Sequence, residues 1–257
     1  MVKRFKVTVP LPEGSEQRNA YVYLPDSYFS NPTKRYPVLY MFDGHNVFFD
    51  SDATYGKSWG MADFMKKSKT QLIIAAVECN HSPNNGRLEE YSPFSFRDPV
   101  HGVIVGRGRV TMNWFVHKFK RQIDRNYRTL PDRAHTFIAG SSMGGLMSLY
   151  ALLKYNDVFS RAAALSPSLW TSPEQVKNMV RHCHMDPDSV LYMDYGTIEF
   201  GNHDQMRTAF GEVAAMMISK KISLNCRIVP GGTHSEASWE RQIPAFMHTL
   251  MYTPDAY

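Results

Sequence analysis

Cysteine is scarce in this chain of 257 residues, and long apolar runs are missing. The three cysteines, Cys79, Cys183 and Cys226, are odd in number and far apart, which argues against a disulfide framework. Without a run of 18 apolar residues, no membrane-spanning helix is expected. Repeats, low-complexity tracts and a linker are also missing, so residues 1–257 are expected to form a single domain.

Signals for secretion and for nucleic-acid binding are also lacking. Residues 1–9 alternate charged and apolar side chains and have no apolar centre like that of a signal peptide. A cytoplasmic location is therefore expected, although a removed leader would leave no trace. The net charge of +5 comes from scattered basic residues. A modest cluster at 118–128 fits the wet face of a helix, so no nucleic-acid partner and no membrane partner are expected.

Metal and cofactor motifs are not recognisable either. The run His182-Cys183-His184 has no second group of ligands elsewhere at a workable spacing, and a tetrahedral site needs four ligands. We therefore expect neither a metal site nor a cofactor. With 43% apolar and 21% charged residues, the chain can build a full core, and disorder is not expected.

Strand-like and helix-like segments alternate along most of the chain. Strands are predicted at 3–10, 20–24, 36–42 and 71–77, a helix at 58–67, and then four strand–helix pairs at 136–139/143–155, 162–165/173–183, 190–195/205–219 and 224–229/236–251. Such alternation predicts an α/β fold whose central sheet is mostly parallel, with helices on both faces. Residues 79–110 break the pattern and are predicted to be a long functional loop insertion, followed by a helix over 110–127.

The sequence Gly140-Ser141-Ser142-Met143-Gly144-Gly145 joins one of these strands to its helix. It matches the G-x-S-x-G pattern, in which a serine sits on a sharp turn with its hydroxyl exposed above the sheet. The alternative interpretation is a glycine-rich turn whose serine only caps the helix. We predict that Ser142 is a nucleophile.

A serine nucleophile needs a base, and the base needs an orienting acid. In open parallel sheets these groups gather at the carboxyl ends of strands. His234 follows the last predicted strand within Gly231-Gly232-Thr233-His234, and it is the best-placed of the ten histidines. Three acids follow or end the strand at 190–195: Glu199 is favoured by its place in the loop, and Asp194 and Asp204 remain alternatives.

The oxyanion that forms during acyl transfer needs hydrogen-bond donors. One predicted donor is the backbone N–H of Met143, at the start of the helix after the nucleophile. The other is the backbone N–H of His45, in the turn Asp43-Gly44-His45-Asn46 that follows the strand at 36–42.

Four segments carry a resemblance to a known family. They are Leu39-Tyr40-Met41-Phe42-Asp43-Gly44-His45-Asn46, Gly140-Ser141-Ser142-Met143-Gly144-Gly145, Tyr195-Gly196-Thr197-Ile198-Glu199 and Gly231-Gly232-Thr233-His234. In this order they resemble the putative-esterase family of α/β-hydrolases, which includes feruloyl and acetyl-xylan esterases, enterochelin esterases and S-formylglutathione hydrolases.

The resemblance covers about residues 18–250 and implies the α/β-hydrolase fold. Family members often have Gly-Thr-x-Asp where this chain has Gly196-Thr197-Ile198-Glu199, which supports Glu199 as the acid although its side chain is one methylene longer. The resemblance also suggests that the 87–93 segment lies at the mouth of the site.

The predicted function is therefore a serine carboxylic-ester hydrolase with a Ser142–His234–Glu199 triad. Its substrates are expected to be esters of small acyl, aromatic or sugar groups, and residues that could contact them are Asn46, Arg87, Tyr91 and Trp170. An acyltransferase that uses the same triad with an alcohol or thiol acceptor is the alternative, and a binding module without catalysis is a third. The sequence is also compatible with a homo-oligomer.

Overall fold

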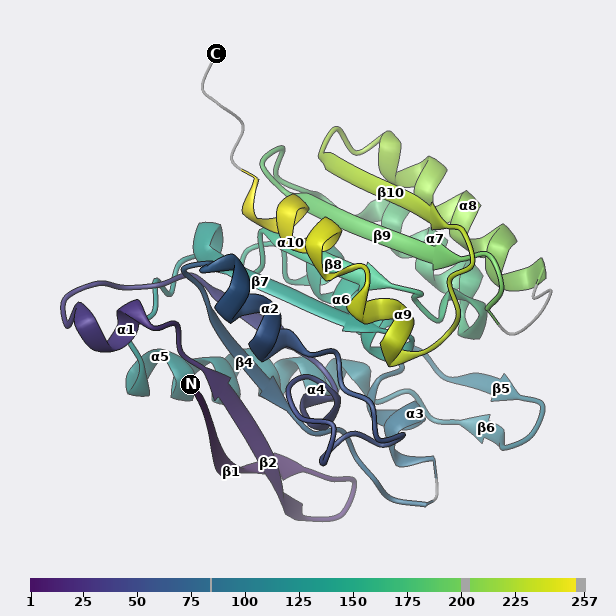
Figure 1. Ribbon diagram of the computed structural model, residues 1–257. Helices are drawn as coiled ribbons and strands as arrows, with labels where there is room; N and C mark the ends of the chain where they lie inside the picture. Colours follow the sequence, from purple (N-terminus) through teal and green to yellow (C-terminus); the bar gives the residue numbers. More distant parts are fainter. Residues whose placement is uncertain (84, 200–203, 253–257) are drawn as a thin grey trace.

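An eight-stranded sheet forms the centre of the molecule (Figure 1). The computed structural model describes residues 1–83, 85–199 and 204–252. The strands are β1 Val2–Pro10, β2 Ser15–Tyr23, β3 Val38–Met41, β4 Ile73–Val77, β7 Thr136–Ser141, β8 Arg161–Leu165, β9 Val190–Gly196 and β10 Ser223–Val229. Their order in the sheet is β1-β2-β4-β3-β7-β8-β9-β10. The β1–β2 and β2–β4 pairs are antiparallel and all other neighbours are parallel. The predicted fold class is confirmed.

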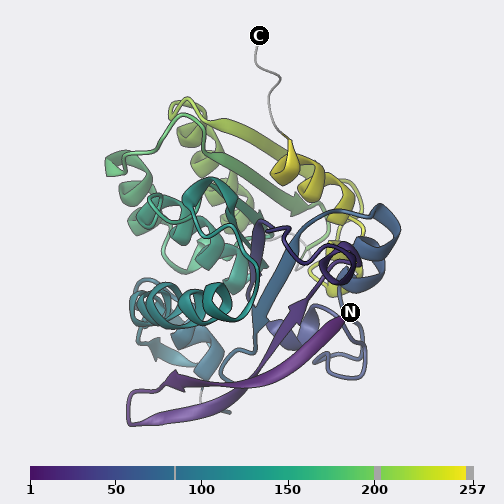
Figure 2. The same cartoon turned by 90° about the vertical axis from the view of Figure 1, so that its left-hand side faces the viewer.

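Helices cover both faces of this sheet (Figure 2). The α-helices are α1 Ser27–Ser30, α2 Met61–Ser68, α3 Gly86–Glu90, α4 Gly108–Trp114, α5 Arg121–Asn126, α6 Met143–Lys154, α7 Pro173–His182, α8 Asp204–Ile218, α9 Glu236–Glu240 and α10 Ile243–Met251. Short 3₁₀ segments are η1 Gly44–Asn46, η3 Arg133–His135 and η4 Leu169–Thr171, and a π-helical segment, η2 Phe115–Lys120, joins α4 to α5. None of the helices in the described part of the chain has the length and apolarity needed to cross a bilayer.

The two faces of the sheet bury separate apolar cores. One core packs α4–η2–α5, α6, α7 and α8 against the sheet, with Phe115, Phe119 and Leu149 among its fully buried side chains. The other packs α2, α9 and α10 against the opposite face and includes Trp59 and Phe246. Burial on both faces explains why β4 reads as a continuous apolar run, since each of its five residues is buried.

The 79–110 segment is more regular than the loop that the sequence predicted. It contains α3, the start of α4 and a small hairpin of β5 Phe96–Asp98 and β6 Gly102–Ile104. The Asp98 carboxylate closes the hairpin by accepting hydrogen bonds from the backbone N–H groups of Val100 and His101. Such short elements have too few residues to show a periodic pattern, so the sequence could not reveal them.

A buried ion pair holds this segment against the sheet. The Arg18 guanidinium, on β2, donates to both carboxylate oxygens of Glu90, on α3, at 2.7 and 2.6 Å. Both residues are buried. The pair fixes the start of the 79–110 segment beside the carboxyl ends of β3 and β4, which is where the site described next begins.

Candidate active site

Ser142 occupies the one-residue turn between β7 and α6. Its backbone has φ 58° and ψ −122°, a conformation that a residue with a side chain rarely adopts. The neighbouring glycines make the turn possible, because a Cβ on Gly140 would lie 2.7 Å from the Gly144 backbone and one on Gly145 would lie 2.6 Å from the Leu165 carbonyl oxygen. The predicted strand–turn–helix arrangement is present, and the turn lifts the Ser142 side chain above the carboxyl end of β7.

A second serine, which the sequence analysis did not single out, touches the Ser142 hydroxyl. The Oγ atoms of Ser142 and Ser168 are 3.3 Å apart, and the Ser168 backbone N–H donates to the Ser142 carbonyl at 3.0 Å. Ser168 is buried in the loop after β8. The parallel strands β7 and β8 are neighbours, so the segments after their carboxyl ends lie side by side. The Ser-Pro-Ser sequence directly after β8 could therefore have indicated a serine beside Ser142.

The structure brings the predicted base and the favoured acid together. His234 Nδ1 and Glu199 Oε2 are 2.9 Å apart, and Glu199 is only 1% exposed. Glu199 lies after β9 and His234 lies after β10, and two glycines allow these loops to meet. A Cβ on Gly196 would lie 2.3 Å from the Gly232 carbonyl oxygen.

Hydrogen bonds hold the Glu199 carboxylate in one orientation. Its Oε1 accepts from the Gly196 backbone N–H at 2.7 Å and from the Ser166 hydroxyl. Ser166 also accepts from the Trp239 indole N–H at 2.9 Å, and the Trp239 ring meets the His234 ring edge to face at 5.0 Å between centroids. Ser166 thus links the acid to the aromatic wall beside the histidine. Sequence reasoning missed this role, which depends on a positive φ of 44° at Ser166.

The two alternative acids have other partners. Asp194 is buried at the end of β9, where it accepts from the Ser166 backbone N–H at 3.1 Å and from the Tyr192 hydroxyl at 2.8 Å. Burial raises the pKa of Asp194 to about 7, and the nearby Glu199 charge adds to the effect. Asp204 is exposed at the start of α8 and pairs with Arg207 three residues along the helix. The contacts therefore favour Glu199.

The raised pKa of Asp194 predicts how stability depends on pH. The pKa rises from 3.8 to about 7 on folding, so between these values the unfolded chain has lost a proton that the folded protein keeps. The stabilisation of the folded protein by protonated Asp194 is fully present below pH 4 and is lost as the pH rises through 7. Asp194→Asn removes this contribution, so its melting temperature minus that of the wild type should increase from pH 4 to pH 8. The test is thermal unfolding of both proteins from pH 4 to pH 8. A constant difference in melting temperature would contradict the raised pKa of Asp194.

The turn after β3, which is predicted to supply an oxyanion donor, lies beside the nucleophile turn. Asp43 is in the left-handed region at φ 53°, and η1 follows it with His45 buried. A Cβ on Gly44 would lie 2.8 Å from the backbone N and C atoms of Val77, so only glycine lets the turn pack against the end of β4. Asp43 lies beside the nucleophile turn, because a Cβ on Gly144 would be 3.2 Å from its Oδ2.

Arg87 and Tyr91, both predicted to contact substrate, hold this turn in place. Arg87 donates to both carboxylate oxygens of Asp43 at 2.7 Å, and the Asp43 backbone N–H donates to the Tyr91 hydroxyl at 3.2 Å. Tyr91 is only 1% exposed and packs against Phe42, whereas about a third of the Arg87 side chain is exposed, so Arg87 stays a candidate substrate contact. Burial alone would raise the pKa of Asp43, but the charge and hydrogen bonds of Arg87 outweigh it and lower that pKa.

Asn46 and Trp170 lie on opposite sides of the site. The Asn46 side chain donates to Glu236 at 3.2 Å and accepts from the Thr54 backbone N–H at 3.0 Å. Glu236 is a buried acid that the sequence analysis missed, and burial raises its pKa.

Trp170 is half-buried on η4 and meets the Phe96 ring of the hairpin edge to face at 5.7 Å. It stays a candidate substrate contact.

Known proteins with similar sequences match parts of this chain. The protein YbbA of Bacillus subtilis is 28% identical over 158 residues, which cover 60% of this chain and 58% of YbbA. An endo-1,4-β-xylanase/feruloyl esterase of Xylanibacter ruminicola is 24% identical over 187 residues, or 70% of this chain and 22% of that protein. The matched part thus spans less than two thirds of either relative.

Solved structures and a family model extend the likeness to nearly the whole chain. An IroE-like serine hydrolase from Shewanella oneidensis superposes with a TM-score of 0.76 at 18% identity, covering 97% of this chain and 79% of that one. At that identity the likeness establishes the fold. The model of the family described as "Putative esterase" matches residues 13–251. The resemblance in the four sequence segments is confirmed, and the chain belongs to the putative-esterase family.

Proposed function

We propose that this protein is a serine carboxylic-ester hydrolase. The observation that carries the proposal is the Glu199–His234 pair, at 2.9 Å, on the same sheet edge as a serine in a strained strand-to-helix turn. Glu199 orients the imidazole and stabilises its charged form, and Nδ1 is the nitrogen that meets the acid. Nε2 is then the nitrogen that exchanges a proton with the Ser142 hydroxyl.

The reaction has two halves. Ser142 Oγ attacks the acyl carbon while His234 takes its proton, and the carbonyl oxygen becomes an oxyanion. The backbone N–H groups of Met143 and His45 donate to this oxyanion. Collapse breaks the ester bond, the alcohol leaves with the proton from His234, and an acyl group stays on Ser142. Water then repeats the attack through His234 and releases the carboxylic acid, which restores the Ser142 hydroxyl.

Esters that carry an aromatic or sugar group are the proposed substrates. Trp170 is half-buried and lies two residues after Ser168, whose hydroxyl touches that of Ser142, so it follows directly a residue that contacts the nucleophile. The buried Phe96 ring supports it edge to face, and the exposed part of Trp170 offers an aromatic surface on which a flat ring can pack. The feruloyl esterase named in the Xylanibacter relative supports the same substrate class.

Covalent labelling and a substrate panel test this proposal together. A fluorophosphonate should modify the protein once, and peptide mass spectrometry should place the label on Ser142. Chromogenic esters from acetyl to octanoyl, methyl ferulate and acetylated sugars then give kcat/KM for each substrate class, and added alcohols measure transfer against hydrolysis. Labelling elsewhere, or no turnover of any ester, would refute the proposal. Acyl transfer to the alcohol that outpaces hydrolysis would replace it with the acyltransferase alternative.

A further inference from the structure

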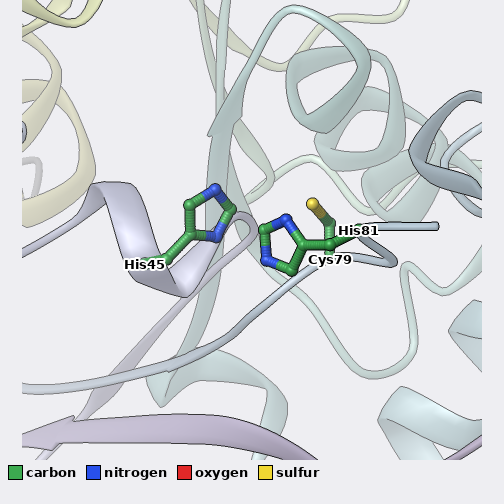
Figure 3. A group of neighbouring side chains, drawn as sticks. All are labelled: His45, Cys79 and His81. Atoms are coloured by element: carbon green, nitrogen blue, oxygen red, sulfur yellow. The ribbon is translucent and has the colours of Figure 1, made fainter. Parts of the chain in front are cut away.

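Three potential metal ligands lie close together at the turn after β3, which contains His45. They are His45 on η1, Cys79 just after β4 and His81 two residues later, and their ligand atoms all lie within 4.8 Å of one another (Figure 3). The two imidazole rings are edge to face, with their centroids 4.6 Å apart. Because β3 and β4 are parallel neighbours, the segments after their carboxyl ends meet here. Sequence analysis saw no metal site because 34 positions separate Cys79 from His45.

His45 is oriented as a metal ligand should be. It is only 4% exposed, and its Nδ1 is buried without a hydrogen-bond partner among the residues that the structure describes. Its Nε2 lies 3.1 Å from the Thr54 hydroxyl. When Nε2–H donates to Thr54, Nδ1 carries an unprotonated lone pair, and a ligating histidine commonly uses its other ring nitrogen in this way. An unpaired buried acceptor is costly, so a ligand for Nδ1 would remove that cost.

Two carboxylates, Asp43 and Glu78, and one guanidinium, Arg87, act on the cluster, so the net charge of these neighbours is negative and favours a cation. The Cys79 thiol is 2% exposed and lies close to the Asp43 carboxylate, and the Asp43 and Glu78 carboxylates both act electrostatically on His45. Glu78 is itself fixed by Asn19 and the Tyr21 hydroxyl. Two imidazole nitrogens and one sulfur form a donor set of borderline softness, which suits Zn²⁺ better than Mg²⁺ or Ca²⁺.

We propose that His45, Cys79 and His81 bind one Zn²⁺ ion, with water as the fourth ligand. Tetrahedral zinc sites place neighbouring nitrogen and sulfur ligands about 3.3–3.6 Å apart, given Zn–N near 2.0 Å and Zn–S near 2.3 Å. The present spread of up to 4.8 Å must therefore contract, and we expect both the exposed His81 and His45, on η1, to move toward the ion. Three bonds from zinc to the protein replace bonds from the hydrated ion to water, one water stays bound, and the Cys79 thiol proton passes to solvent as its sulfur becomes a thiolate.

Zinc at this position should slow ester hydrolysis. His45 would bind the ion with its side chain while its backbone N–H serves the oxyanion, so contraction of the cluster moves the donor. A misplacement of about 1 Å in catalytic geometry can cost roughly 100-fold in rate. The zinc site would thus be inhibitory, and zinc removal would restore activity.

Cobalt spectroscopy tests binding without relying on the proposed function. Metal-free protein titrated with Co²⁺ should develop a thiolate-to-cobalt charge-transfer band at one equivalent, and Zn²⁺ should abolish it. Cys79→Ser should eliminate the band, and His81→Ala should weaken Co²⁺ binding at least 10-fold. Cys226→Ser and Cys183→Ser are the matched controls and should keep the band, since Cys183 follows α7 and Cys226 lies in β10. No band, or a band that survives Cys79→Ser, would overturn the site.

The inhibition is tested by kinetics and rests on the proposed ester hydrolysis. With zinc buffered at saturating concentration, kcat should fall about 10- to 100-fold for the wild type and for Cys226→Ser. Each variant is compared with its own chelator-treated activity, so that intrinsic differences cancel. His81→Ala should lose this zinc dependence. Zinc binding in the cobalt competition without a fall in kcat would refute the inhibitory role, whereas no hydrolysis in the chelator-treated wild type would refute the proposed function instead.

Discussion

Ser142→Ala is expected to lower kcat by about 10⁴-fold while leaving the fold intact. Alanine removes the only atom that forms the acyl-enzyme, and triad members act together, so loss of the nucleophile removes the contribution of all three. KM should change little, because the remaining pocket is unaltered. The measurement is steady-state hydrolysis of the best ester in the panel, with circular dichroism and the melting temperature as tests of folding.

Ser160→Ala is a matched control for this substitution. Ser160 is also a buried serine next to a strand, but it lies at the amino end of β8, and its hydroxyl has no hydrogen-bond partner among the described residues. Its removal should change kcat less than twofold. If Ser142→Ala kept activity within tenfold of the wild type, Ser142 would not be the nucleophile. If the variant failed to fold, the position of the fluorophosphonate label would still decide the question.

The sequence predicted the features that depend on short stretches of chain. Strand–helix alternation, the G-x-S-x-G turn and a histidine after the last strand are all local patterns, and they were enough for the fold and for the approximate place of Ser142 and His234. The predicted helix over 236–251 proved to be two, α9 and α10, with Pro244 in the first turn of the second. A proline there has no N–H to continue the preceding helix, which favours a new start.

Contacts between distant segments could not be predicted in the same way. Tyr91 was expected at the site mouth, but its partner is the Asp43 backbone, 48 positions away, and only the folded sheet brings them together. Ser166 depends on a left-handed backbone that no local pattern in its sequence indicates. Glu236 lies in the first turn of α9, and no local pattern indicates its burial against Asn46, which follows from packing across 190 positions.

Glu199→Gln is expected to be far more damaging than Asp204→Asn, with a fall in kcat of about 10³- to 10⁴-fold for the first. The Glu199 carboxylate contacts three groups that can each donate a hydrogen bond: the Gly196 N–H, the Ser166 hydroxyl and the His234 ring. A glutamine amide has only one acceptor oxygen, so one donor would face its NH₂ group. It also lacks the charge that stabilises the imidazolium and favours the productive tautomer, a loss that costs about 10⁴-fold in the serine proteases.

Asp204→Asn is the matched control because it also exchanges a carboxylate for an amide in the segment after β9. Asp204 is exposed and contacts Arg207 on its own helix, so the substitution should change kcat less than twofold.

The test is kcat and KM for both variants on one ester, with melting temperatures measured in parallel. Because the Glu199 effect acts on the transition state, it should appear in kcat and leave KM nearly constant. A larger fall in kcat for Asp204→Asn would identify Asp204 as the catalytic acid. The 2.9 Å contact between Glu199 and His234 would then have no role in catalysis.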